Sequence, residues 1–117
     1  PMANYCELLY YERYHTDLVN GWWDNRIRFF TPQGWVDSTI YQPKTYEAYR
    51  DAVYLLGALM LDALRKQVGD GVFFAALDDY ARSAAYGLAG PADFWAAFER
   101  QSDVDLSALR TLYLQYP

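Results

Sequence analysis

Apolar residues recur at helical spacing along most of this chain, and the pattern starts at its first residues. Over Ala3–Tyr14, the side chains of Tyr5, Leu8 and Leu9 fall on one face of a helix, as spacings of three and four residues require. The pattern predicts a first helix there.

The longest apolar pattern begins after Pro43 and predicts a main helix over Thr45–Val68. Its expected inner stripe contains Tyr46, Tyr49, Val53, Gly57, Met60 and Leu64. Gly69 should end this helix, because glycine accepts the left-handed conformation of helix ends. Asp70 should then cap the next helix by accepting hydrogen bonds from its free N–H groups.

Three further patterns follow in the C-terminal part. A helix to about Tyr86 has the expected inner face Phe73, Leu77, Tyr80 and Ala84. A helix starting at Gly90-Pro91 has the expected packing residues Phe94, Trp95 and Phe98, with Asp93 complementing the positive helix end. A last helix, capped by Asp103 or Asp105, has the stripe Leu106, Leu109, Leu112 and Tyr113.

The stretch Asp17–Gln42 lacks such a pattern. It contains the turn signals Asn20-Gly21 and Thr31–Gly34 and is rich in aromatic residues, which we expect to anchor it to the core. Only a short helix around Trp22–Phe29 is predicted in it. The expected fold is therefore all-α: a compact helical bundle of about five helices with one long irregular aromatic-rich connection, in a single domain over residues 1–117.

Composition narrows the function classes. Hydrophobic residues make up 53% of the 117 residues and aromatic residues 19%, which fits a packed domain and not a disordered segment. The formal net charge of -5 disfavours binding to nucleic acid or to anionic membranes. We therefore expect neither as a partner.

Few residues offer site chemistry. His15 is the single histidine and Cys6 the single cysteine. A zinc site needs three or four ligands in a set geometry, so we expect none in this chain. We interpret His15 as a surface residue at a helix end and Cys6 as a buried, inert thiol. Asp78 and Asp79 are adjacent on a helix and do not face one site, so a solvated face is the expectation for them. The residues alone predict no metal site and no nucleophile.

The order of several segments resembles the zinc aminopeptidases of the alanyl aminopeptidase and leukotriene hydrolase type. In that family a helix carries a tyrosine, two residues and a glycine, and here Tyr54 and Gly57 stand at those places. Later segments follow in the family's order: Val68-Gly69-Asp70 with Phe73-Phe74, then Asp93-Phe94 to Phe98-Glu99, then Ser102 to Ser107. The resemblance covers most of the chain, and residues 15–44 are its weak part.

The N-terminal helix resembles the one that follows the family's third zinc ligand, a glutamate. That match puts the glutamate just before Pro1 and the family's His-Glu-x-x-His helix further upstream. The resemblance therefore implies that the chain is the C-terminal helical portion of a larger zinc metallopeptidase catalytic domain. Zinc would belong to the parent protein, none is expected in this chain, and a peptide substrate would bind through the parent.

By the same resemblance, Tyr54 falls on the family's catalytic tyrosine, whose hydroxyl donates a hydrogen bond to the oxyanion formed during peptide hydrolysis. The chain departs from the family at Leu56, where a lysine is usual. The alternatives are a non-catalytic helical interaction module or a degenerate peptidase-like domain, in which Tyr54 is one more packing aromatic. An apolar face left open by the missing half would favour a homodimer or a groove near Tyr49, Tyr54 and Leu61.

Overall fold

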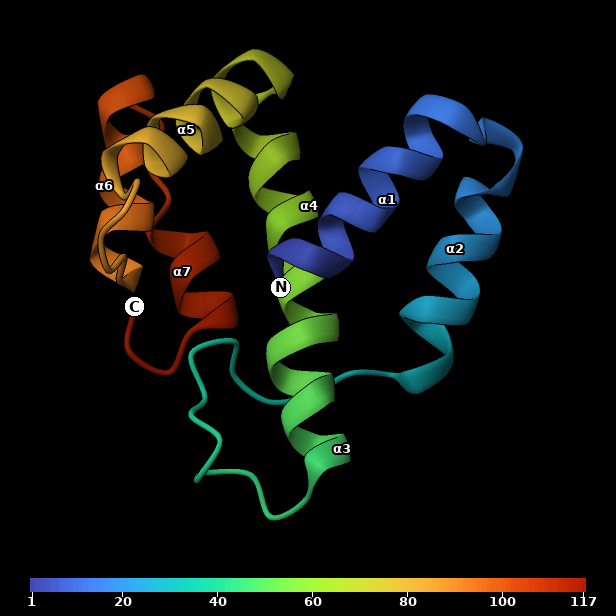
Figure 1. The fold of residues 1–117 in the computed structure, drawn as a ribbon. Coiled ribbons are helices and arrows are strands. Elements are labelled where there is room, and N and C mark those ends of the chain that lie inside the picture. Colours follow the sequence, from blue (N-terminus) through green and yellow to red (C-terminus); the bar gives the residue numbers. More distant parts are fainter. The chain divides into compact units, whose positions relative to one another are not determined.

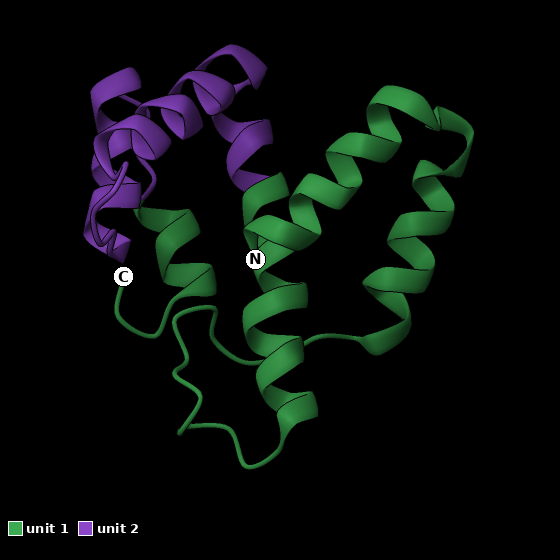
Figure 2. Ribbon diagram, viewed as in Figure 1, with its two compact units in different colours: residues 1–62, 107–117 green, residues 63–106 purple.

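A computed structural model describes all residues from Pro1 to Pro117. The protein is all-α: about 70% of its residues are helical and no strand is present, as the sequence predicted (Figure 1). With the long central helix counted once, there are 6 helices, close to the expected number. The chain divides into two compact units, which Figure 2 distinguishes by colour: residues 1–62 with 107–117, and residues 63–106.

The first unit begins with a pair of helices. Helix α1 (Met2–Tyr14) packs on helix α2 (Val19–Arg26), and short 3₁₀ turns precede and follow α2. The fully or nearly buried side chains here are Tyr5, Leu8, Trp22 and Ile27. The stretch expected to be mostly irregular is thus helical up to Phe30, and Trp22 is the aromatic that anchors it.

One long helix crosses the middle of the sequence. It is composed of α3 (Tyr46–Tyr49), a π-helical segment (Arg50–Leu55) and α4 (Leu56–Val68), which matches the predicted range. Thr45 starts it by accepting a hydrogen bond from the N–H of Ala48 at 3.2 Å. Gly69 ends it with φ of 81°, in the left-handed region that glycine tolerates.

The second unit contains α5 (Asp70–Ser83) and α6 (Pro91–Gln101), packed against each other. The rings of Phe73 and Phe98 approach to 5.8 Å and those of Tyr80 and Phe94 to 5.6 Å between centroids, so an aromatic core joins the two helices. Pro91 is the first residue of α6. The Asp93 carboxylate accepts a hydrogen bond from the N–H of Gly90 at 2.7 Å and closes the helix start.

A connection and the last helix complete the first unit. The loop after Phe30 reaches α7 (Ser107–Tyr113), and the N–H of Val36 donates to the carbonyl of Tyr113. The carboxylate of Asp37 accepts from the N–H groups of Gln115 and Tyr116, at 2.9 and 3.0 Å. These hydrogen bonds tie the irregular loop to the C-terminal residues.

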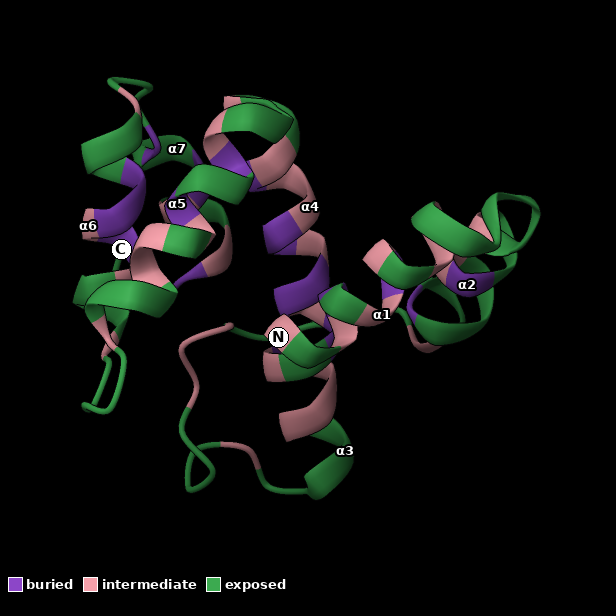
Figure 3. Cartoon of the chain, turned by 45° about the horizontal axis from the view of Figure 1, so that its top comes forward, coloured by how far each residue is buried: buried purple, intermediate pink, exposed green.

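Several details of the expected buried faces were wrong (Figure 3). The main helix buries Ala52 and Leu55 within its π segment, whereas Tyr46 is exposed and Val53 only half-buried. Leu112 is exposed, and Leu114 is buried instead.

Two helix boundaries also differ from the expectation. Gly69, not Asp70, occupies the cap position of α5, because Asp70 is already helical and its carboxylate pairs with Arg65 at 2.8 Å. Helix α5 ends at Ser83, before the predicted Tyr86.

None of the helices combines the length and the hydropathy needed to cross a membrane.

Candidate functional site around Tyr54

Tyr54 lies in the π-helical segment of the long helix, a rare conformation that occurs often at functional sites. In an α-helix, residues three and four apart share a face and residues five apart do not. Hydrogen bonds from residue i to i+5 widen the turn and bring residues five apart closer to alignment. The segment therefore lets Tyr49 and Tyr54 meet, edge to face, with ring centroids 5.9 Å apart.

The side chain of Tyr54 faces outward from this helix. It is 38% exposed, while Ala52 and Leu55 on either side of it are buried. Its hydroxyl makes no hydrogen bond within the chain. The phenol is thus held at its ring by Tyr49 and keeps its donor available to a bound molecule.

The start of α1 lies against the helix just beyond Tyr54. A Cβ built on Gly57 would stand 2.6 Å from Cβ and 2.7 Å from Cγ of Pro1, so the two residues are in direct contact. Figures 1 and 3 both place the N-terminus beside this part of the helix. A hydrogen bond also joins the same elements, because the Tyr5 hydroxyl donates to the Asp62 carboxylate at 3.3 Å.

The irregular loop approaches the same helix from another side. Gly34 has φ of 116°, and a Cβ there would lie 2.7 Å from Cβ of Ala52. The guanidinium of Arg50 lies over the ring of Phe30 at 4.4 Å and pairs with the carboxylate of Asp51 at 2.6 Å. The turn that carries Tyr54 is therefore fixed by the loop as well as by α1.

A shallow hollow adjoins the Tyr49–Tyr54 pair. It has a volume of about 410 Å³ and is lined by Ile40, Pro43, Lys44, Thr45, Tyr46 and Tyr49. Ile40 and Tyr46 are largely exposed beside it. We call Tyr46, Tyr49 and Tyr54 the aromatic face, and Ile40 lies next to it in the lining of the hollow. Leu61, which we expected to be part of this surface, is buried.

The other residues considered from sequence form no comparable site. His15 is exposed at the end of α1, as predicted. Cys6 is exposed, so the prediction of a buried thiol was wrong: its neighbour Tyr5 takes the inner position of that turn. Asp78 pairs with Arg82 and Asp79 with Arg100, both at 2.8 Å, which agrees with a solvated charged face.

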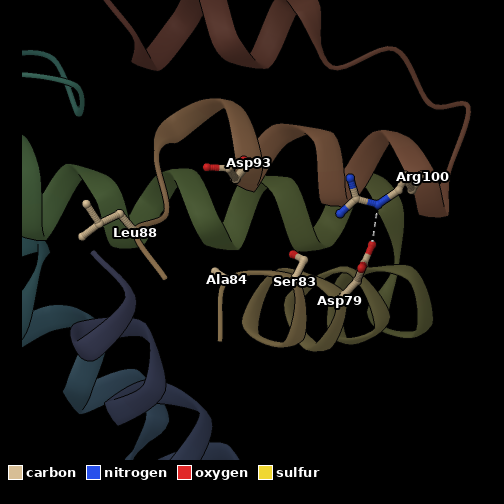
Figure 4. A pocket seen from close by; sticks show the side chains of 6 residues that line it. All are labelled: Asp79, Ser83, Ala84, Leu88, Asp93 and Arg100. Atoms are coloured by element: carbon tan, nitrogen blue, oxygen red, sulfur yellow. Dashed lines mark hydrogen bonds and ion pairs between the residues drawn. The ribbon is translucent and has the colours of Figure 1, made fainter. Parts of the chain in front are cut away.

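The second unit has a cavity of about 300 Å³ near these ion pairs, shown in Figure 4. It is lined by Asp79, Ser83, Ala84, Leu88, Asp93 and Arg100. Asp79 and Arg100 form an ion pair in its lining, and the Ser83 hydroxyl donates to the carbonyl of Tyr80. The guanidinium of Arg100 lowers the pKa of the Asp79 carboxyl. The ion pair of Asp79 and Arg100 thus joins α5 to α6.

No three histidine, cysteine, aspartate or glutamate side chains of the chain gather where they could hold a metal ion. The residues present therefore do not fit a zinc site. No protein-family model, curated protein or solved structure matches the chain.

Sequence reasoning singled out Tyr54 but missed the features around it. The π segment has no signature in the pattern of apolar residues. The contact between Pro1 and Gly57 joins residues far apart in the chain, and the one available signal was a glycine inside an otherwise apolar helix, which often marks a close approach.

Proposed function

We propose that this chain is the C-terminal helical portion of a zinc aminopeptidase-like catalytic domain, in which Tyr54 donates a hydrogen bond to the reacting carbonyl oxygen of a peptide. The order of motifs from Tyr54 to Ser107 supports the proposal. So does the position of Tyr54 on a π turn, with an exposed ring and a hydroxyl open to a ligand.

The observation that carries the proposal is the contact between Pro1 and Gly57. By the resemblance, a zinc-ligating glutamate would stand just upstream of Pro1. Gly57 is three residues beyond Tyr54, which is about 4.5 Å along a helix axis. A segment arriving at Pro1 would therefore bring its ligand close to the Tyr54 hydroxyl, as joint action on one carbonyl requires.

The chemistry suits tyrosine. When water attacks a peptide carbonyl, its oxygen gains negative charge, and a donor fixed beside it stabilises the transition state more than the substrate. A phenol stays protonated at neutral pH, so it can donate throughout the reaction. Its ring contact with Tyr49 restricts the positions that the hydroxyl can take.

Tyr54→Phe in the protein that includes the upstream segment tests this role. We expect kcat on an aminoacyl anilide to fall on the order of 100-fold, with KM little changed, because one oxyanion donor is removed. Tyr46→Phe is the matched control, since it deletes an exposed hydroxyl on the same helix. Turnover of Tyr54→Phe within twofold of that control would refute the proposed role.

The chain alone should bind no stoichiometric zinc and should not hydrolyse an aminoacyl anilide. Tight one-to-one binding of zinc, measured by calorimetry, would contradict the assignment of the ligands to an upstream segment.

The aromatic face should also cause the isolated chain to self-associate, because exposed apolar surface favours burial. A single monomeric species in sedimentation at high concentration would contradict that expectation.

A further inference from the structure

Gly57 is buried in the long helix, and the ring of Pro1 occupies the space where a side chain would be. A Cβ added at Gly57 would lie 2.6 Å from Pro1 Cβ, 2.7 Å from its Cγ and 3.4 Å from its Cα. Ordinary carbon contacts begin near 3.5 Å, so any side chain here must displace Pro1 or the helix.

The ring of Pro1 cannot easily move away from an added side chain. Its ring is closed onto its own backbone, so its Cβ and Cγ cannot rotate away as the end of a flexible side chain could. A glycine within a helix costs about 1 kcal/mol relative to alanine. Glycine at this position is thus locally unfavourable, and the close approach of α1 explains its presence.

We infer that Gly57 is a positioning residue for Tyr54: by having no side chain, it sets the separation between the start of α1 and the helical turn that bears the phenol. In its catalytic consequence the inference depends on the proposed function. By the proposed function, a zinc-ligating glutamate stands just upstream of Pro1. The zinc ion that it holds and the Tyr54 hydroxyl can act on the same carbonyl only if their separation is fixed. A misplacement of about 1 Å can cost on the order of 100-fold in rate.

The contact itself can be tested in this chain by NMR, independently of any activity. In the wild type, Pro1 ring protons should show nuclear Overhauser contacts to the Gly57 α-protons. Gly57→Ala puts a methyl group in the space of the Pro1 ring, so it should displace Pro1 and shift the Tyr54 ring resonances. The double variant Pro1→Gly/Gly57→Ala removes the ring atoms nearest to the added methyl group, so it should return the Tyr54 resonances toward their wild-type positions.

Gly71→Ala is the matched control, because it makes the same change in α5 with no atom within 4 Å of the added Cβ. It should leave the Tyr54 resonances unmoved. If Gly57→Ala leaves them equally unmoved, the inference is overturned. Should Gly57→Ala fail to fold, Pro1→Gly alone tests the same contact by loosening it, and unchanged Tyr54 resonances in that variant would also overturn the inference.

Kinetics in the protein with the upstream segment separate this inference from the proposed function. We expect Gly57→Ala to lower kcat about tenfold or more with a smaller change in KM, and Pro1→Gly to restore part of the loss. If Tyr54→Phe slows turnover but Gly57→Ala behaves like Gly71→Ala, the positioning role fails and the proposed function stands. If Tyr54→Phe has no effect, the proposed function fails, and the catalytic role of Gly57 fails with it.

Discussion

The rings of Tyr49 and Tyr54 meet edge to face although the two residues are five positions apart along one helix. This relationship depends on the π-helical segment Arg50–Leu55, since an α-helix would turn the two side chains to different faces. A local irregularity of the backbone therefore determines where a phenol is presented, and it does so at the one residue for which we propose a chemical role.

Replacing Tyr49 by alanine tests the energetic value of this pair. We expect Tyr49→Ala to lower the free energy of unfolding by about 0.5–1.5 kcal/mol beyond its loss of buried area, the usual range for an aromatic pair. Tyr49→Phe retains the ring and should lose less. Urea unfolding measures both, with Tyr46→Ala on the same helix as an exposed control. An equal loss in Tyr49→Ala and Tyr46→Ala would show that the ring contact contributes nothing.

Asp37 should be the main attachment of the C-terminal residues. Its carboxylate accepts from two consecutive backbone N–H groups, Gln115 and Tyr116. We expect Asp37→Ala to lower the free energy of unfolding by about 1.5–3 kcal/mol, the usual range for hydrogen bonds to a charged group. Hydrogen exchange should accelerate at both amides. Asp103→Ala, at an exposed carboxylate, should leave their exchange unchanged, and unaltered exchange in Asp37→Ala would contradict the attachment.

The ion pair of Asp79 and Arg100 predicts that the stability of the fold depends on pH. The Arg100 guanidinium lowers the pKa of the Asp79 carboxyl in the folded state. A carboxyl with a lowered folded-state pKa binds its proton more readily when unfolded, so the pair stabilises the fold near neutral pH. That stabilisation is lost as the pH falls below about 4.

Asp79→Asn should therefore be less stable than the wild type at pH 7, and the difference should shrink toward pH 2. Thermal unfolding across this pH range measures it. Asp103→Asn serves as the control, since that exposed side chain has no ion pair. A difference between wild type and Asp79→Asn that stays constant from pH 7 to pH 2 would exclude the pair as its source.

Tyr86 offers a stabilising substitution. It has φ of 61°, a left-handed conformation that is unfavourable for tyrosine, and its side chain is fully exposed in the connection after α5. Asparagine tolerates this conformation, so Tyr86→Asn should raise the free energy of unfolding by about 0.5–1 kcal/mol. Tyr41→Asn, at an exposed tyrosine of ordinary φ, should change it little. Equal effects of the two substitutions would argue against backbone strain at Tyr86.

The helices could be predicted because their signals are local. Apolar spacing located the main helix. Gly69 marked its end and Pro91 marked the start of α6, through backbone preferences that act within a few residues. The stretch after Tyr14 was predicted less well. Helix α2 has no continuous apolar stripe, and its one buried residue is Trp22.

The candidate site could be predicted only in part. A motif singled out Tyr54, but its exposure and its ring partner depend on a change of helical register that no apolar periodicity encodes. The proximity of Pro1 to Gly57 is a tertiary contact, and a glycine gives no indication of which distant residue fills its space. The prediction for Cys6 was wrong because adjacent helical positions face different ways. Tyr5 occupies the buried position, and Cys6 therefore faces solvent.

The exposure of Cys6 has a practical consequence. The chain has a single thiol, and it stands in solvent on α1, next to the buried Tyr5 whose hydroxyl reaches Asp62. A maleimide fluorophore or a nitroxide would attach at this one place without any engineered cysteine. The mobility of the label would report whether α1 stays packed on the long helix, so the sequence already supplies a probe for the contact between Pro1 and Gly57.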